Sequence, residues 1–218
     1  MKKYKKAIII GGSKGIGKAI TVQLNKICKK VIPCSRKEID TSNLDSVKSF
    51  LKKHNSTDIL VLNTGGPPSL KIEEIDENLW YKYFNQLFLS YFLILKRIKI
   101  NKSGYIFYIS STIIKEPNTN LVLSSSLRTA FSSFFKSYSI IASKKKICCI
   151  NIAPGPTKTK RLKKLVNNIN KYKKNLPLGD LCSPKEIGEF VKFVSEKKIK
   201  YLSGSTVYFE GNLLKSFL

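Results

Sequence analysis

The stretch "AIIIGGSKGIGKAI", residues 7–20, joins four consecutive apolar residues to a glycine-rich turn and the start of a helical pattern. Gly11, Gly15 and Gly17 would permit a tight turn, close approach of the backbone to a pyrophosphate, and close packing of helix against strand. The amides at the helix N-terminus would then face the phosphates. Because the turn follows a strand and opens a helix, we interpret it as a dinucleotide-binding loop rather than a plain tight turn.

Apolar runs of strand length alternate with segments of helical length along the whole chain. The predicted strands are "KAIIIG" (6–11), "KVIPCS" (30–35), "DILVLN" (58–63), "GYIFYIS" (104–110), "ICCINIAPG" (147–155) and "GSTVYFEG" (204–211). The predicted helices cover residues 17–29, 44–54, 77–98, 126–143 and 183–197. Runs that are apolar throughout suit strands covered on both faces. We therefore predict an α/β fold with a doubly wound parallel sheet, in a single domain over residues 1–218.

The end of the second predicted strand indicates which dinucleotide is bound. A site for NAD usually has an acid there, which holds the ribose hydroxyls. This strand ends with Ser35 and Arg36, and Lys14 stands in the glycine loop. Two cations and a hydroxyl suit a 2′-phosphate, and no acid at this point would repel it. NADP is the predicted cofactor, with NAD as the alternative.

The formal net charge of +26 would attract nucleic acid, anionic lipid or acidic proteins. The lysines are scattered, however, without interleaved aromatic residues, and only four of the 40 basic residues are arginine. We interpret the charge as compositional drift on a solvated surface and do not expect nucleic acid as the main partner. The run "AIII" is too short for a signal core or a membrane span. Five cysteines without metal-ligand spacing indicate reduced thiols in the cytoplasm.

Several motifs in order resemble the short-chain dehydrogenase/reductase family over essentially the whole chain. They are "GGSKGIG", "DILVLNTGGPP", "GYIFYISS", "INIAPGPTKT" and "LSGSTVYFEG". The chain looks most similar to proteins resembling 3-oxoacyl-[acyl-carrier-protein] reductases of fatty acid biosynthesis, in a divergent branch with "GGPP" and "LxLSxxxR". The resemblance implies an oxidoreductase that uses a nicotinamide cofactor.

The resemblance also implies which residues hold the cofactor. Phosphate contacts would come from the glycine loop, adenine contacts from "EIDTSN", ribose contacts from "NTGG" and nicotinamide contacts from "PGPTKT". In that order the residues are Gly11, Ser13, Lys14, Gly15, Ile16 and Gly17; Asp40 and Thr41; Asn63 and Gly65; and Pro154, Gly155, Thr157 and Thr159. The connection from Arg36 to Asp40 is shorter than in the family, so a helix is expected to be missing there.

At the catalytic positions, the chain departs from the family pattern of serine, tyrosine, lysine and asparagine. Ser111 matches the serine that orients the carbonyl. Ser124 stands for the tyrosine, Arg128 for the lysine, and the asparagine position falls near Leu87. Ser124 and Arg128 are one helical turn apart and should share a face. We take Ser111, Ser124 and Arg128 as the candidate catalytic residues.

Loss of the tyrosine weakens a reductase without abolishing hydride transfer in principle. Arg128 keeps a charge that can hold ribose hydroxyls or stabilise a carbonyl oxygen, and Ser124 or a water could relay the proton. The prediction is an NADP(H)-dependent carbonyl reductase, acting on a small molecule or on 3-oxoacyl chains of an acyl carrier protein. The alternatives are a silent nucleotide-binding subunit or sensor and, in a third class, a nucleic-acid binder. The helix 77–98 is apolar nearly all round, which favours a homodimer or homotetramer over a deeply buried helix.

Overall fold

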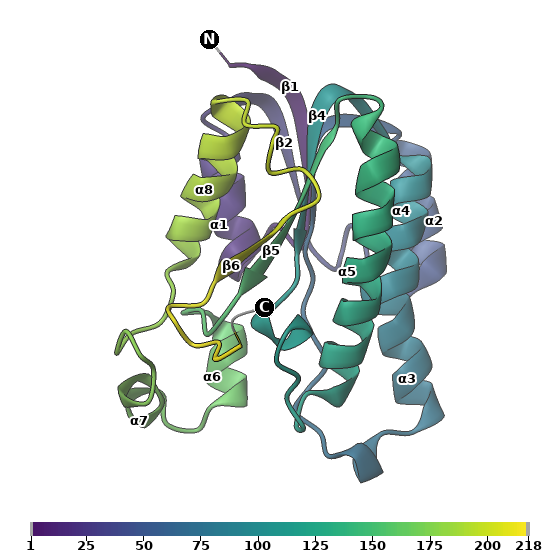
Figure 1. Ribbon diagram of the computed structural model, residues 1–218. Helices are drawn as coiled ribbons and strands as arrows, with labels where there is room; N and C mark the ends of the chain where they lie inside the picture. Colours follow the sequence, from purple (N-terminus) through teal and green to yellow (C-terminus); the bar gives the residue numbers. More distant parts are fainter. Residues whose placement is uncertain (1, 217–218) are drawn as a thin grey trace.

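The computed structural model describes residues 2–216 and shows one parallel six-stranded sheet between two layers of helices (Figure 1). The strand order is β2-β1-β3-β4-β5-β6. The strands are β1 Tyr4–Ile10, β2 Cys28–Cys34, β3 Ser56–Leu62, β4 Lys99–Ile109, β5 Cys148–Pro154 and β6 Thr206–Phe209. All six predicted strands are confirmed. The parallel arrangement brings every carboxyl end to the same edge of the sheet, where ligands bind in such folds.

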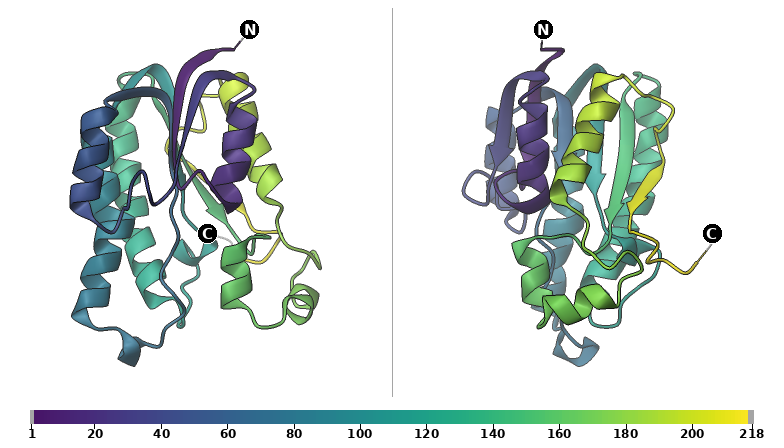
Figure 2. Two further views of the ribbon diagram at one scale, coloured as in Figure 1. Left: turned by 180° about the vertical axis from the view of Figure 1, so that it is seen from behind. Right: turned by 90° about the vertical axis from the view of Figure 1, so that its left-hand side faces the viewer.

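The helices cover the two faces of the sheet unequally (Figure 2). On one face, α1 (Gly15–Leu24) and α8 (Pro184–Glu196) pack together and onto β1, β3, β4 and β5. The other face is covered by α2 (Leu44–Lys53), α4 (Ser90–Arg97) and α5 (Val122–Ser143). Cys148 and Cys149, neighbours on β5, belong to the opposite cores, as an alternating strand requires.

Two helices differ from their predicted bounds in ways that affect the site. The helix expected at 126–143 begins at Val122, so Ser124 lies in its first turn. The helix expected at 77–98 is α3 (Glu77–Phe84) and α4 joined by a π-helical segment, Asn85–Leu89. A π-helical segment inserts an extra residue into a helix and is frequent at functional sites.

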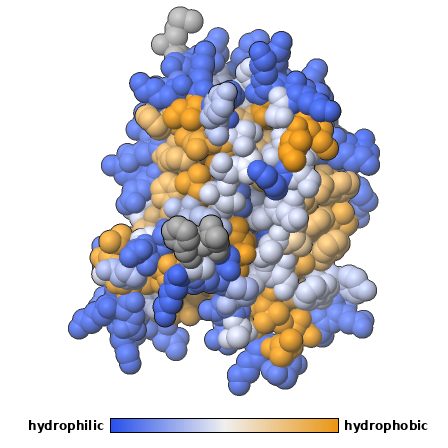
Figure 3. All heavy atoms as spheres, in the orientation of Figure 1, coloured by the Kyte–Doolittle hydropathy of each residue, from blue (hydrophilic) through white to orange (hydrophobic). Residues whose placement is uncertain are grey.

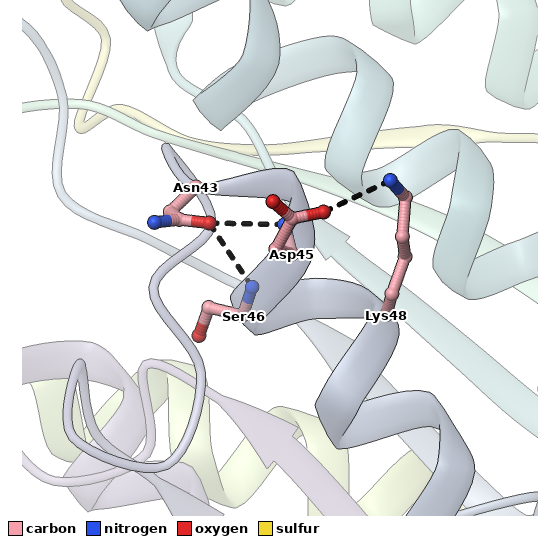
Figure 4. Close-up of polar contacts among 4 residues, drawn as sticks. All are labelled: Asn43, Asp45, Ser46 and Lys48. Carbon is pink, nitrogen blue, oxygen red and sulfur yellow. Dashed lines mark hydrogen bonds and ion pairs between the residues drawn. The ribbon is translucent and has the colours of Figure 1, made fainter.

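The connection after β2 is short, as the sequence predicts. Doubly wound dinucleotide folds commonly place a further strand beside the second one, in the order 3-2-1-4-5-6. Here β2 is the edge strand, and the chain passes directly into α2. Asn43 caps α2: its Oδ1 accepts hydrogen bonds from the backbone N–H groups of Asp45 and Ser46 (Figure 4). Lys48 forms an ion pair with Asp45 on the same turn.

Two short helices, α6 (Lys160–Leu165) and α7 (Ile169–Lys174), follow β5 and lie beyond the carboxyl ends of the strands (Figure 1). Two short 3-10 turns, Ile72–Glu74 after β3 and Thr112–Ile114 after β4, are the remaining helical elements of the described residues. Hydrophilic residues cover the rim of the molecule, with apolar patches between them (Figure 3). Within residues 2–216, no helix combines the length and the apolar character that crossing a membrane requires.

Candidate active site

The glycine loop has the geometry of a phosphate cradle. Gly11 and Gly15 have φ angles of 66° and 52°, which glycine adopts without strain. A Cβ on Gly17 would lie 2.1 Å from the carbonyl oxygen of Gly11, so no larger residue fits there. Lys14 is the N-cap of α1 and its side chain makes no capping hydrogen bond. The first amides of α1 are therefore available to a dinucleotide pyrophosphate.

Two other predicted cofactor segments meet this loop. Asn63, just after β3, donates a hydrogen bond from Nδ2 to the carbonyl oxygen of Gly11 at 3.1 Å. Thr159, which caps α6, lies with its methyl group 3.3 Å from where a Cβ of Gly15 would be. The residues predicted to hold the two ends of the coenzyme thus converge on one edge of the sheet. This arrangement fits a bound dinucleotide, which would supply the hydride of a reduction.

The segment after β5 is held rigidly by its own hydrogen bonds. Pro154 ends the strand, and the N–H of Gly155 donates to the carbonyl oxygen of Phe209 on β6 at 2.9 Å. Thr157 is buried, and its hydroxyl donates back to the Gly155 carbonyl oxygen at 2.9 Å. Contact between this segment and the nicotinamide amide stays a prediction.

The end of β2 differs from the predicted site in one respect. Arg36 is exposed, and Ser35 is half-buried. We expected no acid here, but Glu38 lies at this point: its Oε2 accepts a hydrogen bond from the Ser35 N–H at 2.6 Å. Hydrogen bonding to Ser35 lowers the pKa of Glu38, so the carboxylate is ionised within the turn that carries Arg36. Glu38 follows the strand by four residues, and the tight turn that returns it to Ser35 could not be read from composition.

The adenine segment is shaped by local polar contacts. Asp40 accepts hydrogen bonds from both the N–H and the hydroxyl of Ser42, at 2.9 and 2.7 Å. Burial raises the pKa of Asp40, but the Ser42 hydrogen bonds outweigh it and the net pKa is lowered. The hydroxyl of buried Thr41 lies 3.2 Å from that of Thr64, which ties this segment to the loop after β3.

Ser124 and Arg128 form one buried unit at the start of α5. Their side chains share a face of the helix, with exposed fractions of 4% and 6%. The Arg128 Nε donates to the Ser124 Oγ at 3.2 Å, and its Nη1 donates to the carbonyl oxygen of Ile109 at 3.1 Å. Because Ser124 accepts from a cation, its own proton stays available for a second acceptor. The predicted pairing of these two residues on one face is confirmed.

Ser111 follows β4 by two residues and is half-buried. Its Oγ accepts a weak hydrogen bond from the Ile113 N–H at 3.5 Å. Within the described residues no hydrogen bond joins Ser111 to Ser124 or Arg128. Ser111 therefore stands near the same sheet edge as a separate hydroxyl, free to turn toward a ligand.

Leu87, near which we expected the family's asparagine position, lies in an apolar cluster. Leu87 is fully buried in the π-helical segment, where it packs with Tyr83, Leu123 and Leu127. Its neighbour Gln86 makes the polar contact instead, donating from Nε2 to the carbonyl oxygen of Gly65 at 2.6 Å. Sequence reasoning missed Gln86, because only the π-helical segment reveals which side chain faces the loop.

Two buried tyrosines lie beneath the Arg128 guanidinium, Tyr91 on α4 and Tyr108 on β4. Within the described residues neither hydroxyl has a hydrogen-bond partner. Burial raises the pKa of both phenols, and the positive charge of Arg128 opposes the rise. Arg161 on α6 was also missed. Its Nη2 donates to the carbonyl oxygen of Pro67, and the only signal in the sequence is an arginine in a lysine-rich chain.

Comparison with known proteins agrees with this geometry. A family model described as enoyl-(acyl carrier protein) reductase matches residues 38–211. A 3-oxoacyl-[acyl-carrier-protein] reductase of Buchnera aphidicola subsp. Acyrthosiphon pisum is 28% identical over 235 residues, which cover 95% of this chain and 96% of that protein. An uncharacterized oxidoreductase of Bacillus subtilis, YvaG, is 22% identical over 97% of each chain.

Two solved structures share the fold at lower identity. YwfH, an NADPH-dependent reductase involved in bacilysin biosynthesis, has a TM-score of 0.87 at 20% identity and covers 97% of this chain and 99% of its own. The angucycline C-6 ketoreductase LanV with bound NADP has a TM-score of 0.86 at 18% identity, over 95% and 94%. The family match, the sheet and the glycine loop agree, and the chain belongs to the short-chain dehydrogenase/reductase family of NAD(P)-dependent oxidoreductases.

Proposed function

We propose that the protein is an NADP(H)-dependent carbonyl reductase that works with Ser124 and Arg128 in place of a tyrosine and a lysine. One observation carries the proposal. Ser124 and Arg128 are buried, joined by a hydrogen bond and anchored to the end of β4, at the edge where Asn63 and Thr159 reach the glycine loop. A buried arginine kept at this edge has a use in holding negative charge, whereas drift would leave it on a solvated face.

The residues suit the developing charge of a reduction. As hydride reaches the carbonyl carbon, negative charge grows on the oxygen, and fixed donors in a site with little water stabilise it most. The Ser124 hydroxyl can donate to that oxygen while it accepts from Arg128. Tyr91 and Tyr108 are fully buried, so their hydroxyls do not reach a substrate, and burial also raises the pKa of both phenols. The proton then comes from water and is relayed through Ser124, whose hydroxyl gives its proton to the oxygen and takes another from the water.

The proposed preference for NADP over NAD rests on one cation in the glycine loop and one after β2. Lys14 and Arg36 are exposed cations near the place of a ribose 2′-phosphate, which supports NADP. Glu38 opposes this preference by adding an ionised carboxylate beside Ser35. The two positive charges, one on Arg36 and one on Lys14, outnumber the single negative charge of Glu38. NADP therefore remains the proposed cofactor and NAD the alternative.

Names of relatives suggest the first substrate class to test, 3-oxoacyl thioesters on an acyl carrier protein. A cytoplasmic location is proposed from the five cysteines without metal-ligand spacing. The net charge of +26 would assist docking of an acidic carrier. We also propose a homodimer or homotetramer. Ile140 and Ile141 on α5 are 62% and 66% exposed, and a partner subunit would cover them. Analytical ultracentrifugation tests this: a monomer at all concentrations would contradict it.

The test is NADPH oxidation, followed at 340 nm with a panel of carbonyl compounds that includes acetoacetyl thioester. We expect turnover by the wild type. Ser124→Ala should lower kcat by roughly 10²-fold, the usual effect of removing one donor at a developing oxyanion. Binding of NADPH, measured separately, should change less than about twofold, because Ser124 contacts the substrate side.

The alternative function, a nucleotide-binding subunit or sensor without turnover, is favoured by one observation: Leu87 and Ser124 replace two polar catalytic groups of the family. It predicts NADPH binding without reduction of any carbonyl. The double variant Ser124→Tyr/Arg128→Lys then decides between the two. If the wild type is inactive and the double variant gains activity, the natural protein is a nucleotide-binding protein without turnover. If the wild type is active, the serine–arginine pair is a working catalytic site.

A further inference from the structure

Two arginines from distant parts of the chain meet above Gly66. A Cβ placed on Gly66 would lie 3.2 Å from the Nη2 of Arg161, 3.5 Å from the Nη2 of Arg128 and 3.6 Å from the Oγ of Ser124. Three polar groups thus surround one point that only a glycine leaves open. The two nitrogens lie within about 7 Å of each other, close enough for strong repulsion between like charges in a partly buried site.

No carboxylate of the described residues neutralises this pair. All four ion pairs in residues 2–216 use lysine, namely Lys48–Asp45, Lys173–Asp180, Lys185–Glu189 and Lys192–Glu196. Arg128 is 6% exposed and spends its Nε and Nη1 on Ser124 and Ile109, which leaves Nη2 facing Gly66. Burial lowers the pKa of Arg161, and the Arg128 charge lowers it further. Charges buried without a counter-charge are costly, so the folded protein favours an anion between them.

We propose that Arg128 and Arg161 bind the carboxylate of an oxo-acid substrate, with the carboxylate within two carbon atoms of the carbonyl that is reduced. A planar guanidinium matches a carboxylate, and two of them can hold both of its oxygens. Ser124 lies beside the same point, so an anion held there places the neighbouring carbonyl next to its hydroxyl. The inference rests on the proposed carbonyl reductase activity and replaces the neutral acyl thioester with an anionic substrate.

A phosphate of the coenzyme is the other anion that could lie between the two arginines, but its expected binding site is elsewhere. Its cradle is the loop after β1, while Arg128 is anchored at the end of β4. β3 lies between these strands, and neighbouring strands are about 4.8 Å apart, so the cradle and the Arg128 anchor are about 10 Å apart across the sheet, while Thr159, two residues before Arg161, reaches the loop itself. We assign the anion to the substrate because the Ser124 hydroxyl lies beside the same point, and the NADPH affinity of Arg161→Met tests the coenzyme phosphate as the other source.

The test compares each acid with its uncharged ester. KM and kcat with NADPH are measured for 2-oxobutanoate and 3-oxobutanoate, for their methyl esters and for the neutral N-acetylcysteamine thioester of 3-oxobutanoate. The wild type should prefer at least one acid to its ester by 10-fold or more in kcat/KM, in line with the usual effect of a charge-assisted hydrogen bond. Arg161→Met should raise KM for that acid by about 10-fold or more and leave the ester within about twofold.

Matched variants distinguish the effect of the Arg161 charge from a loss of folding and from a change in the net charge of the protein. Lys164→Met removes one exposed cation from the same helix and should leave the acid KM unchanged. Arg161→Lys, which keeps the charge but not the fork, should fall between the wild type and Arg161→Met. Equal losses for acid and ester, or an NADPH affinity that falls in Arg161→Met, would overturn the carboxylate site. So would a wild type that uses the thioester as well as the acids.

A second readout keeps the site testable without turnover. Calorimetric titration of 2-oxobutanoate and of 3-oxobutanoate into the protein saturated with NADP+ measures binding alone. At least one acid should bind 10-fold or more tighter than its ester, and Arg161→Met should abolish the difference. If NADPH binds, the acids bind and no carbonyl is reduced, the proposed reductase function fails while the anion site stands. If neither acid is preferred to its ester, the anion site fails whatever the activity.

Discussion

At the scale of single residues, the serine at position 124 is best understood together with Arg128. The four-residue spacing on α5 places both side chains on one face, and the 3.2 Å contact between Nε and Oγ makes each the partner of the other. The Arg128 guanidinium occupies one lone pair of the Ser124 oxygen, so the hydroxyl proton stays available to a second acceptor. The pair supplies charge and direction where a phenol would supply acidity.

We propose that coenzyme preference is set by two residues of opposite charge after β2, Arg36 and Glu38. Arg36→Gln should raise the Kd for NADPH about 10-fold, because it removes a charge-assisted contact to the 2′-phosphate, and leave the Kd for NADH nearly unchanged. Glu38→Gln should lower the Kd for NADPH several-fold, since its ionised carboxylate repels the phosphate. Fluorescence titration of both coenzymes measures this. Parallel changes for NADPH and NADH would place the 2′-phosphate elsewhere.

At the scale of elements, the strands and the glycine loop could be predicted because their signals are local. Uniform apolar runs mark strands that are covered on both faces, and the close contact of Gly17 with Gly11 demands residues without a side chain. Arg161 could not be predicted, because its role arises only when α6 carries it back to the Pro67 carbonyl. Glu38 was missed for a similar reason: a tight turn, not a pattern, brings it to Ser35.

The cap of α2 sets the entry to the shortened connection, and its contribution can be measured. The Asn43 Oδ1 satisfies the N–H groups of Asp45 and Ser46, which have no other partner in the first turn (Figure 4). Asn43→Ala should lower the free energy of unfolding by about 1 kcal/mol in urea denaturation. Asp45→Ala, which breaks an exposed ion pair with Lys48 and removes the acidic charge of the first turn, should cost less than that amount. An equal loss for both variants would contradict the role assigned to the cap.

At the scale of the whole molecule, the six-stranded sheet has β2 at its edge, without the further strand that dinucleotide folds commonly place beside it. The glycine loop has the turn that a pyrophosphate needs, and on the side where adenine is expected the Thr41 hydroxyl lies beside that of Thr64. The carboxyl edge collects the glycine loop, Asn63, Thr159, the Ser124–Arg128 pair and Arg161 from elements far apart in the sequence. Every functional proposal depends on a dinucleotide at this edge.

Isothermal titration of the wild-type protein with NADPH and with NADH tests that dependence most directly. We expect heat from one site per chain with NADPH, and a Kd at least about 10-fold lower than for NADH, because Lys14 and Arg36 add contacts to the extra phosphate. Absence of heat with both coenzymes, in protein whose circular dichroism shows the folded α/β domain, would contradict the account at its base.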